Sequence, residues 1–159
     1  MVMQELEDRI KRLEASVSQM VRQGIVTSVQ PDRGTVRVEL PDADRLISKE
    51  LPVLFQRTAD NKSYDMPDID EQVVCLFLPN GMEQGFVLGS PYSEADPVPV
   101  TDPEKRHYVF KDGTWMEYDR KAHKLTLEVK GSMDIHADND ITIDSGTHIR
   151  MTAPRIDLN

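Results

Sequence analysis

The stretch GSMDIHADNDITIDSGTHIRMTAPRIDLN, residues 131–159, decides the fold of this chain. Its apolar residues come in pairs, and the two members of a pair are two positions apart, so each pair fits one face of a short strand. The pairs recur about every eight residues. They are Met133 with Ile135, Ile141 with Ile143, Ile149 with Met151, and Ile156 with Leu158. A lone ribbon of such strands would leave one face open to water, so this segment needs partners.

Two architectures bury a regular series of short strands: a solenoid made by one chain, or a prism in which several chains wind about one axis. A single-chain solenoid would reach barely two turns and have an unprotected end. We therefore favour the intertwined form, a triple-stranded β-helix shaft over residues 107–159, because three walls are the minimum that closes a prism. The predicted shaft interior consists of Leu125, Leu127, Met133, Ile135, Ile141, Ile143, Ile149, Met151, Ile156 and Leu158.

The other end of the chain, residues 1–23, predicts a helix. Its apolar residues follow one another at steps of three and four, which is an unbroken heptad pattern. They are Met3, Leu6, Ile10, Leu13, Val17 and Met20. Gly24 is a natural stop for this helix. The narrow stripe favours a parallel coiled coil that holds the same copies in register, and the alternative is an amphipathic helix lying on its own domain.

Between the two ends, residues 24–93 carry strand signals closed by Gly and Pro turns. GIVTSVQPDRGTVRVEL, residues 24–40, reads as a hairpin with a PDRG turn. Three more strands follow in ELPVLFQ, EQVVCLFLPNG and GFVLG, and the continuous run QVVCLFL predicts a strand buried on both faces. The sequence therefore predicts a small OB-like antiparallel barrel. A linker rich in proline follows at residues 94–106.

The composition suits an elongated or oligomeric chain, and the strand patterns make it mainly β. Apolar residues are 38% and aromatics 6% of 159 residues, which is little for a self-contained globule of this length. The net charge of −9 is concentrated in the middle of the chain, in residues 39–96, and this argues against a nucleic-acid ligand there. No stretch is long and apolar enough to span a bilayer, and no signal peptide is visible.

No catalytic or cofactor site is predicted. Glu117, Asp119 and Glu128 suggest a paired-carboxylate glycosidase, but alternation on water-facing strands explains them without any chemistry. Cys75 lies in an apolar run and reads as a buried, inert thiol. The histidines are scattered at His107, His123, His136 and His148. His148 is the one metal candidate, and alternation turns it away from the axis. We therefore expect no metal and no enzyme.

Three segments together resemble the phage baseplate assembly protein V family, the central spikes of contractile tails. They are GIVTSVQPDRGTVRVEL, VVCLFLPNGMEQGFVLGSPYS and YVFKDGTWMEYDRKAHKLTLEVKGS. The most specific parts are GFVLGSPY and the phrase F-x-DG-x-x-x-EY, formed by Phe110, Asp112, Gly113, Glu117 and Tyr118. The plan is similar to that of spikes in R-type bacteriocins and type VI secretion systems.

The resemblance implies an OB domain followed by a trimeric triple-stranded β-helix. The homotrimer would sit in the baseplate of a virion or tail-like particle, assembled in the bacterial cytoplasm. Its N-terminal end would meet tail hub, tube and baseplate proteins, and sheath contraction would drive it through the target cell envelope.

The sequence departs from the family pattern at two places. Many members end in a His-x-His pair that binds iron at the apex, whereas here Ile149 and Arg150 follow His148. A separate PAAR-like protein would then cap the tip, or the natural chain extends beyond Asn159. RTADNKSYDMPDID, residues 57–70, replaces an aromatic-rich stretch of the family. The main alternative function is a coiled-coil-tethered OB scaffold that recruits a partner and has a loose β tail.

Overall fold

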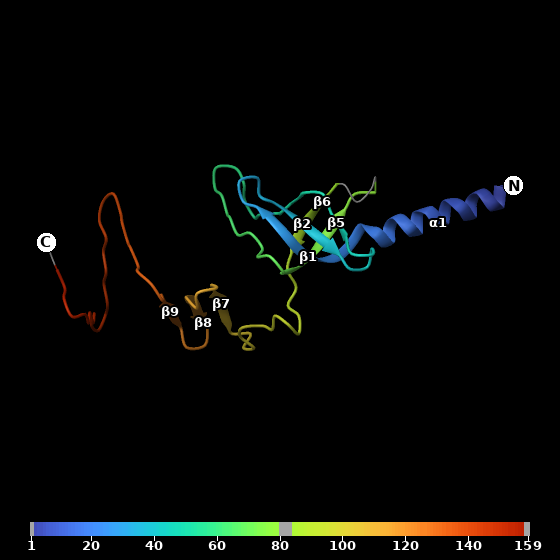
Figure 1. Cartoon of the computed structure of the whole chain (residues 1–159). Helices are drawn as coiled ribbons and strands as arrows, with labels where there is room; N and C mark the ends of the chain where they lie inside the picture. The colour runs from blue at the N-terminus through green and yellow to red at the C-terminus, as the bar shows by residue number, and fades with distance from the viewer. Residues whose placement is uncertain (1, 80–83, 158–159) are drawn as a thin grey trace. The chain divides into compact units, whose positions relative to one another are not determined.

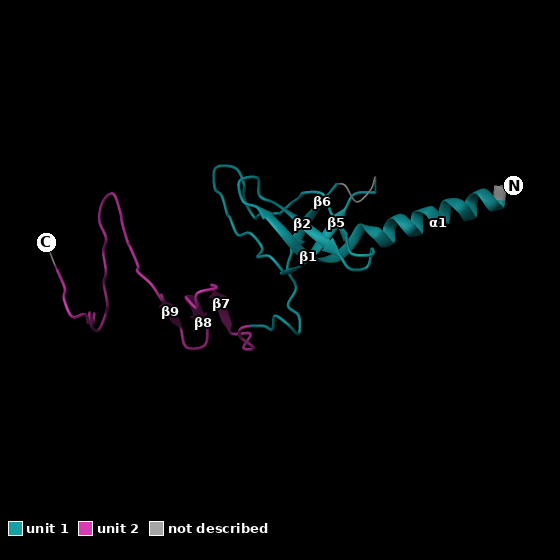
Figure 2. Ribbon diagram, in the orientation of Figure 1, with its two compact units in different colours: residues 1–98 teal, residues 99–159 magenta. Residues whose placement is uncertain are grey.

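The computed structural model describes residues 2–79 and 84–157, which form two compact units, residues 1–98 and 99–159 (Figures 1 and 2). The predicted interior residue Leu158 and most of the predicted loop after Pro79 lie outside the described residues. Unit 1 holds α1 (Val2–Met20), β1 (Val21–Gln30), β2 (Thr35–Leu40), β3 (Leu46–Ile47), β4 (Leu51–Pro52), β5 (Gln72–Phe77) and β6 (Gly85–Gly89). Unit 2 holds β7 (Lys105–Val109), β8 (Trp115–Asp119) and β9 (Lys124–Glu128). The chain is thus mainly β with an N-terminal helix.

The strands of unit 1 form an OB-like barrel. The sheet runs in the order β3-β2-β1-β5-β6, and β4 pairs with β2. A parallel bridge between Val53 and Val87 connects the segment after β4 to β6, and the Leu54 amide donates to the Val87 carbonyl at 3.0 Å. The predicted hairpin is confirmed, since β1 and β2 pair antiparallel up to Gln30 and Thr35.

Alternating residues of the barrel strands fill its core. Val26, Val36, Val38, Leu40, Leu51, Val73, Cys75, Phe77 and Val87 are all buried. In β5 every second residue is buried and the others are only half-buried, so the prediction of a strand buried on both faces is wrong. Burial raises the pKa of the Cys75 thiol to about 11, which agrees with an inert side chain.

The helix ends at Met20, so the predicted stop at Gly24 is wrong. The strand β1 begins at the very next residue, and its first part pairs with β5, with Gly24 opposite Val73. A Cβ atom on Gly24 would lie 2.2 Å from Cγ1 of Val38 and 2.7 Å from the carbonyl oxygen of Glu39. Glycine is therefore required at this position by close packing of the strands and not by a helix end.

Unit 2 begins with an antiparallel sheet in the order β7-β8-β9. The first strand starts at Lys105, inside the predicted linker, and the unit boundary after Val98 also falls in that linker. From residue 129 to 157 no strand pairs within the chain, and all these residues but one are exposed. An extended segment without partners in its own chain is what the intertwined shaft requires, and the shaft itself stays a prediction. Among the described residues, no helix has the length and apolar character to cross a membrane.

Candidate functional site

The helix α1 carries an apolar stripe without a partner. The predicted seam residues lie along it, and those from Met3 to Val17 are 48–72% exposed, while Met20 is half-buried. A helix of this length is marginal in water unless such a stripe is covered. We therefore define Met3, Leu6, Ile10, Leu13, Val17 and Met20 as the α1 stripe, the first candidate association surface.

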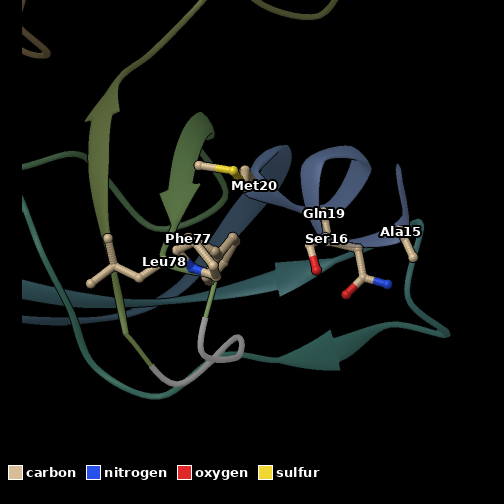
Figure 3. Close-up of a pocket in the computed structure, with 7 residues that line it drawn as sticks. Ala15, Ser16, Gln19, Met20, Phe77 and Leu78 are labelled. Atoms are coloured by element: carbon tan, nitrogen blue, oxygen red, sulfur yellow. The ribbon is translucent and has the colours of Figure 1, made fainter. Parts of the chain in front are cut away.

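Only the last turn of α1 packs on its own barrel. Ala15, Ser16, Gln19 and Met20 line a small cavity of about 130 Å³ together with Phe77, Leu78 and Pro79 at the end of β5 (Figure 3). Three of these four helical residues lie outside the α1 stripe. The alternative of a helix lying on its own domain therefore accounts for the final turn alone, and most of the stripe stays uncovered.

Exposed apolar surface continues from the helix into the barrel. Val21 and Ile25 of β1 are 59% and 37% exposed and line an open groove of about 580 Å³. The Arg22 guanidinium, on the same strand, lies 2.8 Å from the Asp42 carboxylate at the groove. This ion pair joins β1 to the turn after β2, and so helps to fix the strand that follows the helix.

The sheet of unit 2 has one largely apolar face, which also carries Arg106 of β7 and which the sequence pattern only partly indicated. Register places Tyr108 opposite Met116 and Met116 opposite Leu127, while Tyr118 lies opposite Leu125. These five side chains share a face because register partners and alternate residues of a strand point the same way. They are 39–65% exposed.

Only Leu125 and Leu127 of this face belong to the predicted interior. The sequence contains a signal for two of the others, because Met116 and Tyr118 lie two positions apart on either side of Glu117, whereas Tyr108 is followed by Val109 and Phe110. A prediction that pairs the two leucines alone misses the contribution of these three side chains.

The opposite face of the same sheet carries polar groups that have partners, beside Val109 and Trp115. The Lys105 ammonium donates to Glu117 at 2.8 Å, and His107 Nδ1 lies 3.1 Å from the other carboxylate oxygen of Glu117. The His107 ring stacks on Trp115 with centroids 5.7 Å apart. The hydrogen bond from Lys105, with a smaller contribution from His107, holds the pKa of Glu117 below its ordinary value. A polar face with its own partners is suited to contact with water.

The carboxylates considered for catalysis have structural partners in this sheet. A lowered pKa keeps Glu117 ionised, which is the opposite of what a general acid requires. Asp119 accepts hydrogen bonds from the amides of Ala122 at 2.8 Å and Lys121 at 2.9 Å, which lowers its pKa. Glu128 forms an ion pair with Lys130. The geometry explains all three without a reaction.

The phrase F-x-DG-x-x-x-EY builds the turn between β7 and β8. Asp112 accepts from the Thr114 amide at 2.8 Å and from the Thr114 hydroxyl at 3.0 Å. Gly113 has a φ of +83°, a conformation that glycine adopts at no steric cost. The Phe110 amide donates to the Thr114 carbonyl at 2.8 Å and so closes the turn. These residues are thus structural.

Acidification is expected to weaken the sheet of unit 2 through Glu117. Because its folded pKa lies below the unfolded value of 4.5, its contribution is present above pH 4.5 and is lost as pH falls through the folded pKa. Glu117→Gln should lower the melting temperature at pH 7 and flatten its decline between about pH 5 and about pH 3. Fluorescence of the single tryptophan, Trp115, reports the melting. Asp134→Asn, an exposed acid outside the sheet, is the control, and an unchanged decline in Glu117→Gln would contradict this role.

No metal site is formed in the described part of the chain, where no three His, Cys, Asp or Glu side chains converge. His148 is exposed and lies in the unpaired segment. The predicted interior residues of this segment are also exposed, by 49–66%, and no contact within one chain brings them together. They are Met133, Ile135, Ile141, Ile143, Ile149, Met151 and Ile156.

Comparison with known proteins identifies the barrel. Residues 22–92 match the family model described as the type VI secretion system/phage-baseplate injector OB domain. Over 154 residues the chain is 23% identical to the spike protein of Escherichia phage P2, an alignment that covers 92% of this chain and 72% of that protein. Both matches agree with the resemblance drawn from the sequence.

Proposed function

Because residues 22–92 match the injector OB-domain family and the chain is similar over most of its length to a phage spike protein, we propose that it is a homotrimeric central spike of a contractile injection machine. The matched family and the similar phage protein support the coarser statement, a structural spike or baseplate role. Trimerisation, the intertwined shaft and piercing of the target envelope are the proposal.

The observation that carries the proposal is the uncovered apolar surface of unit 2. Its sheet exposes one apolar face, and the segment after the sheet exposes apolar pairs at regular spacing. Three copies arranged about an axis would turn these side chains inward and leave the Lys105–Glu117–His107 face in water. Each Ile or Leu buried in this way contributes about 1.5–3 kcal/mol. Burial in such an assembly explains both the spacing and the exposure.

An intertwined shaft is suited to transmitting axial force. A chain in such a shaft cannot leave without breaking contacts with both neighbours along its length, so sheath contraction would push a body that resists unfolding. The helices and OB domains would dock to tail hub, tube and baseplate proteins. The far end would press on the target envelope directly or through a separate PAAR-like cap.

The mass of the purified chain in solution tests the proposal. Light scattering is expected to give a mass near three times 18.1 kDa, and the same species should persist in unheated SDS. Heating in SDS should release single chains. A monomer in solution, or a dimer that dissociates at once in SDS, would contradict the intertwined trimer.

Limited proteolysis separates the spike from the alternative, a coiled-coil-tethered OB scaffold with a loose tail. Lys121, Lys124 and Lys130 are exposed in the single chain, and a loose tail would be cut there by trypsin. An intertwined shaft should instead remain intact under digestion that cuts a denatured control. Rapid cleavage at these lysines would favour the scaffold.

A further inference from the structure

The charged residues that flank the α1 stripe have opposite signs on its two sides. The stripe consists of two rows of residues: the first is Met3, Ile10 and Val17, and the second is Leu6, Leu13 and Met20. Glu7 and Glu14 directly follow residues of the second row and so lie on the flank beside that row. Arg9 occupies the flank before the first row. All three side chains are exposed, and in the described part of α1 none of them has an ion pair within its own chain.

These positions distinguish parallel from antiparallel association. In a parallel, in-register coiled coil, a residue on the flank before the first row lies beside the residue five positions later in the neighbouring helix. That places Arg9 of one copy beside Glu14 of the next. In an antiparallel pair each flank faces the equivalent flank of the neighbouring helix, so Glu7 of one copy would lie beside Glu14 of the other. The parallel arrangement pairs opposite charges, and the antiparallel arrangement opposes like charges.

We propose that α1 associates with α1 of other copies of this chain in parallel and in register, and that an ion pair between Arg9 of one copy and Glu14 of the next selects this arrangement. The inference rests on the proposed homotrimer and adds its orientation determinant. The OB barrel leaves these residues accessible, because its cavity with α1 involves only helical residues from Ala15 onward. The uncovered α1 stripe, with its oppositely charged flanks, is therefore suited to pack against α1 of a second copy.

Cysteine cross-linking of the full chain tests the orientation. Cys75 is fully buried, so an engineered thiol on α1 is the reactive one. Leu6→Cys places thiols side by side only when the helices run parallel. Leu13→Cys lies near the middle of the stripe, so its thiols stay within one helical turn of each other in either orientation, and it is the matched control.

Leu6→Cys is expected to give disulfide-linked chains in mild oxidant as readily as Leu13→Cys. Cross-linking of Leu13→Cys alone would show antiparallel helices and contradict the inference. Failure of both variants to cross-link would show that α1 does not associate with itself, which also contradicts it.

Charge exchange in the Leu6→Cys background tests the ion pair. Arg9→Glu or Glu14→Arg should each lower the equilibrium extent of cross-linking in a thiol redox buffer by about fivefold at low salt. The double variant Arg9→Glu, Glu14→Arg should restore it, because the pair is re-formed with its charges exchanged. Arg12→Glu changes the same charge away from the flanks and should have little effect. A double variant no better than the single ones would overturn the pairing.

Failure of this inference is distinguishable from failure of the proposed trimer. The mass in unheated SDS depends on the shaft, whereas the cross-link reports α1. Chains that keep the trimer mass but do not cross-link through Leu6→Cys would contradict helix pairing and leave the spike intact.

Discussion

Ile143→Asp should abolish the trimer, so that light scattering gives a mass of 18.1 kDa in place of three times that value. In the proposed shaft the substitution would bring three carboxylates, one from each chain, into an apolar interior without counter-charges. Burying an ionised group without a partner costs several kcal/mol, and three together also repel one another. In the single chain Ile143 is 63% exposed, so the same change costs nothing there. Any loss of assembly therefore reports contacts between chains.

Thr142→Asp is the matched control for this experiment. It adds the same charge one residue earlier, on the side that alternation turns to water, and should leave the mass and the SDS resistance unchanged. Circular dichroism of both variants should show that the OB barrel stays folded. If Ile143→Asp still formed trimers with a normal melting temperature, the proposed shaft would be contradicted.

Gly24→Ala should destabilise the OB domain by about 3 kcal/mol, measured as a shift in the urea midpoint of unfolding. The added Cβ would meet Cγ1 of Val38 at 2.2 Å and the carbonyl oxygen of Glu39 at 2.7 Å. Val38 is fully buried and the oxygen belongs to a paired strand, so neither group has room to withdraw. The strain must therefore separate β1 from β2 locally.

Gly131→Ala is the control, because nothing lies within 4 Å of a Cβ at that position. It should leave the urea midpoint of the OB domain unchanged. A glycine that merely ended a helix would also resist substitution, but by only about 1–2 kcal/mol, the cost of a left-handed conformation for alanine. A Gly24→Ala variant as stable as the parent would contradict the close contact.

Local patterns predict the elements that depend on local signals. The heptad steps from Met3 to Met20 indicate the helix, and the turn from Pro31 to Gly34 indicates the first hairpin. Gly34 has a φ of +63°, which explains why a glycine follows the turn. The barrel and the sheet of unit 2 likewise follow from alternation and turn residues.

Features that depend on contacts distant in sequence could not be read in this way. Gly24 resembles a helix terminator unless one knows that Val38 packs against it. The run from Val73 to Phe77 looks buried on both faces because its outward residues are also apolar, and only the fold shows that they are half-exposed. In the loop that reads as polar, Tyr64 stacks on Phe55 with centroids 5.7 Å apart. The proposed shaft interior would depend on other chains, so a single chain cannot display it.

No loop separates the helix from the barrel, because Val21 of β1 directly follows Met20 of α1. With no loop to absorb rotation, a twist applied to α1 passes into β1, where the Arg22–Asp42 ion pair and the ladder to β5 resist it. In the proposed spike, a torque applied to the helices would therefore be passed on to the OB domains. Flexibility built in at this junction would let the helix turn while the barrel lags behind.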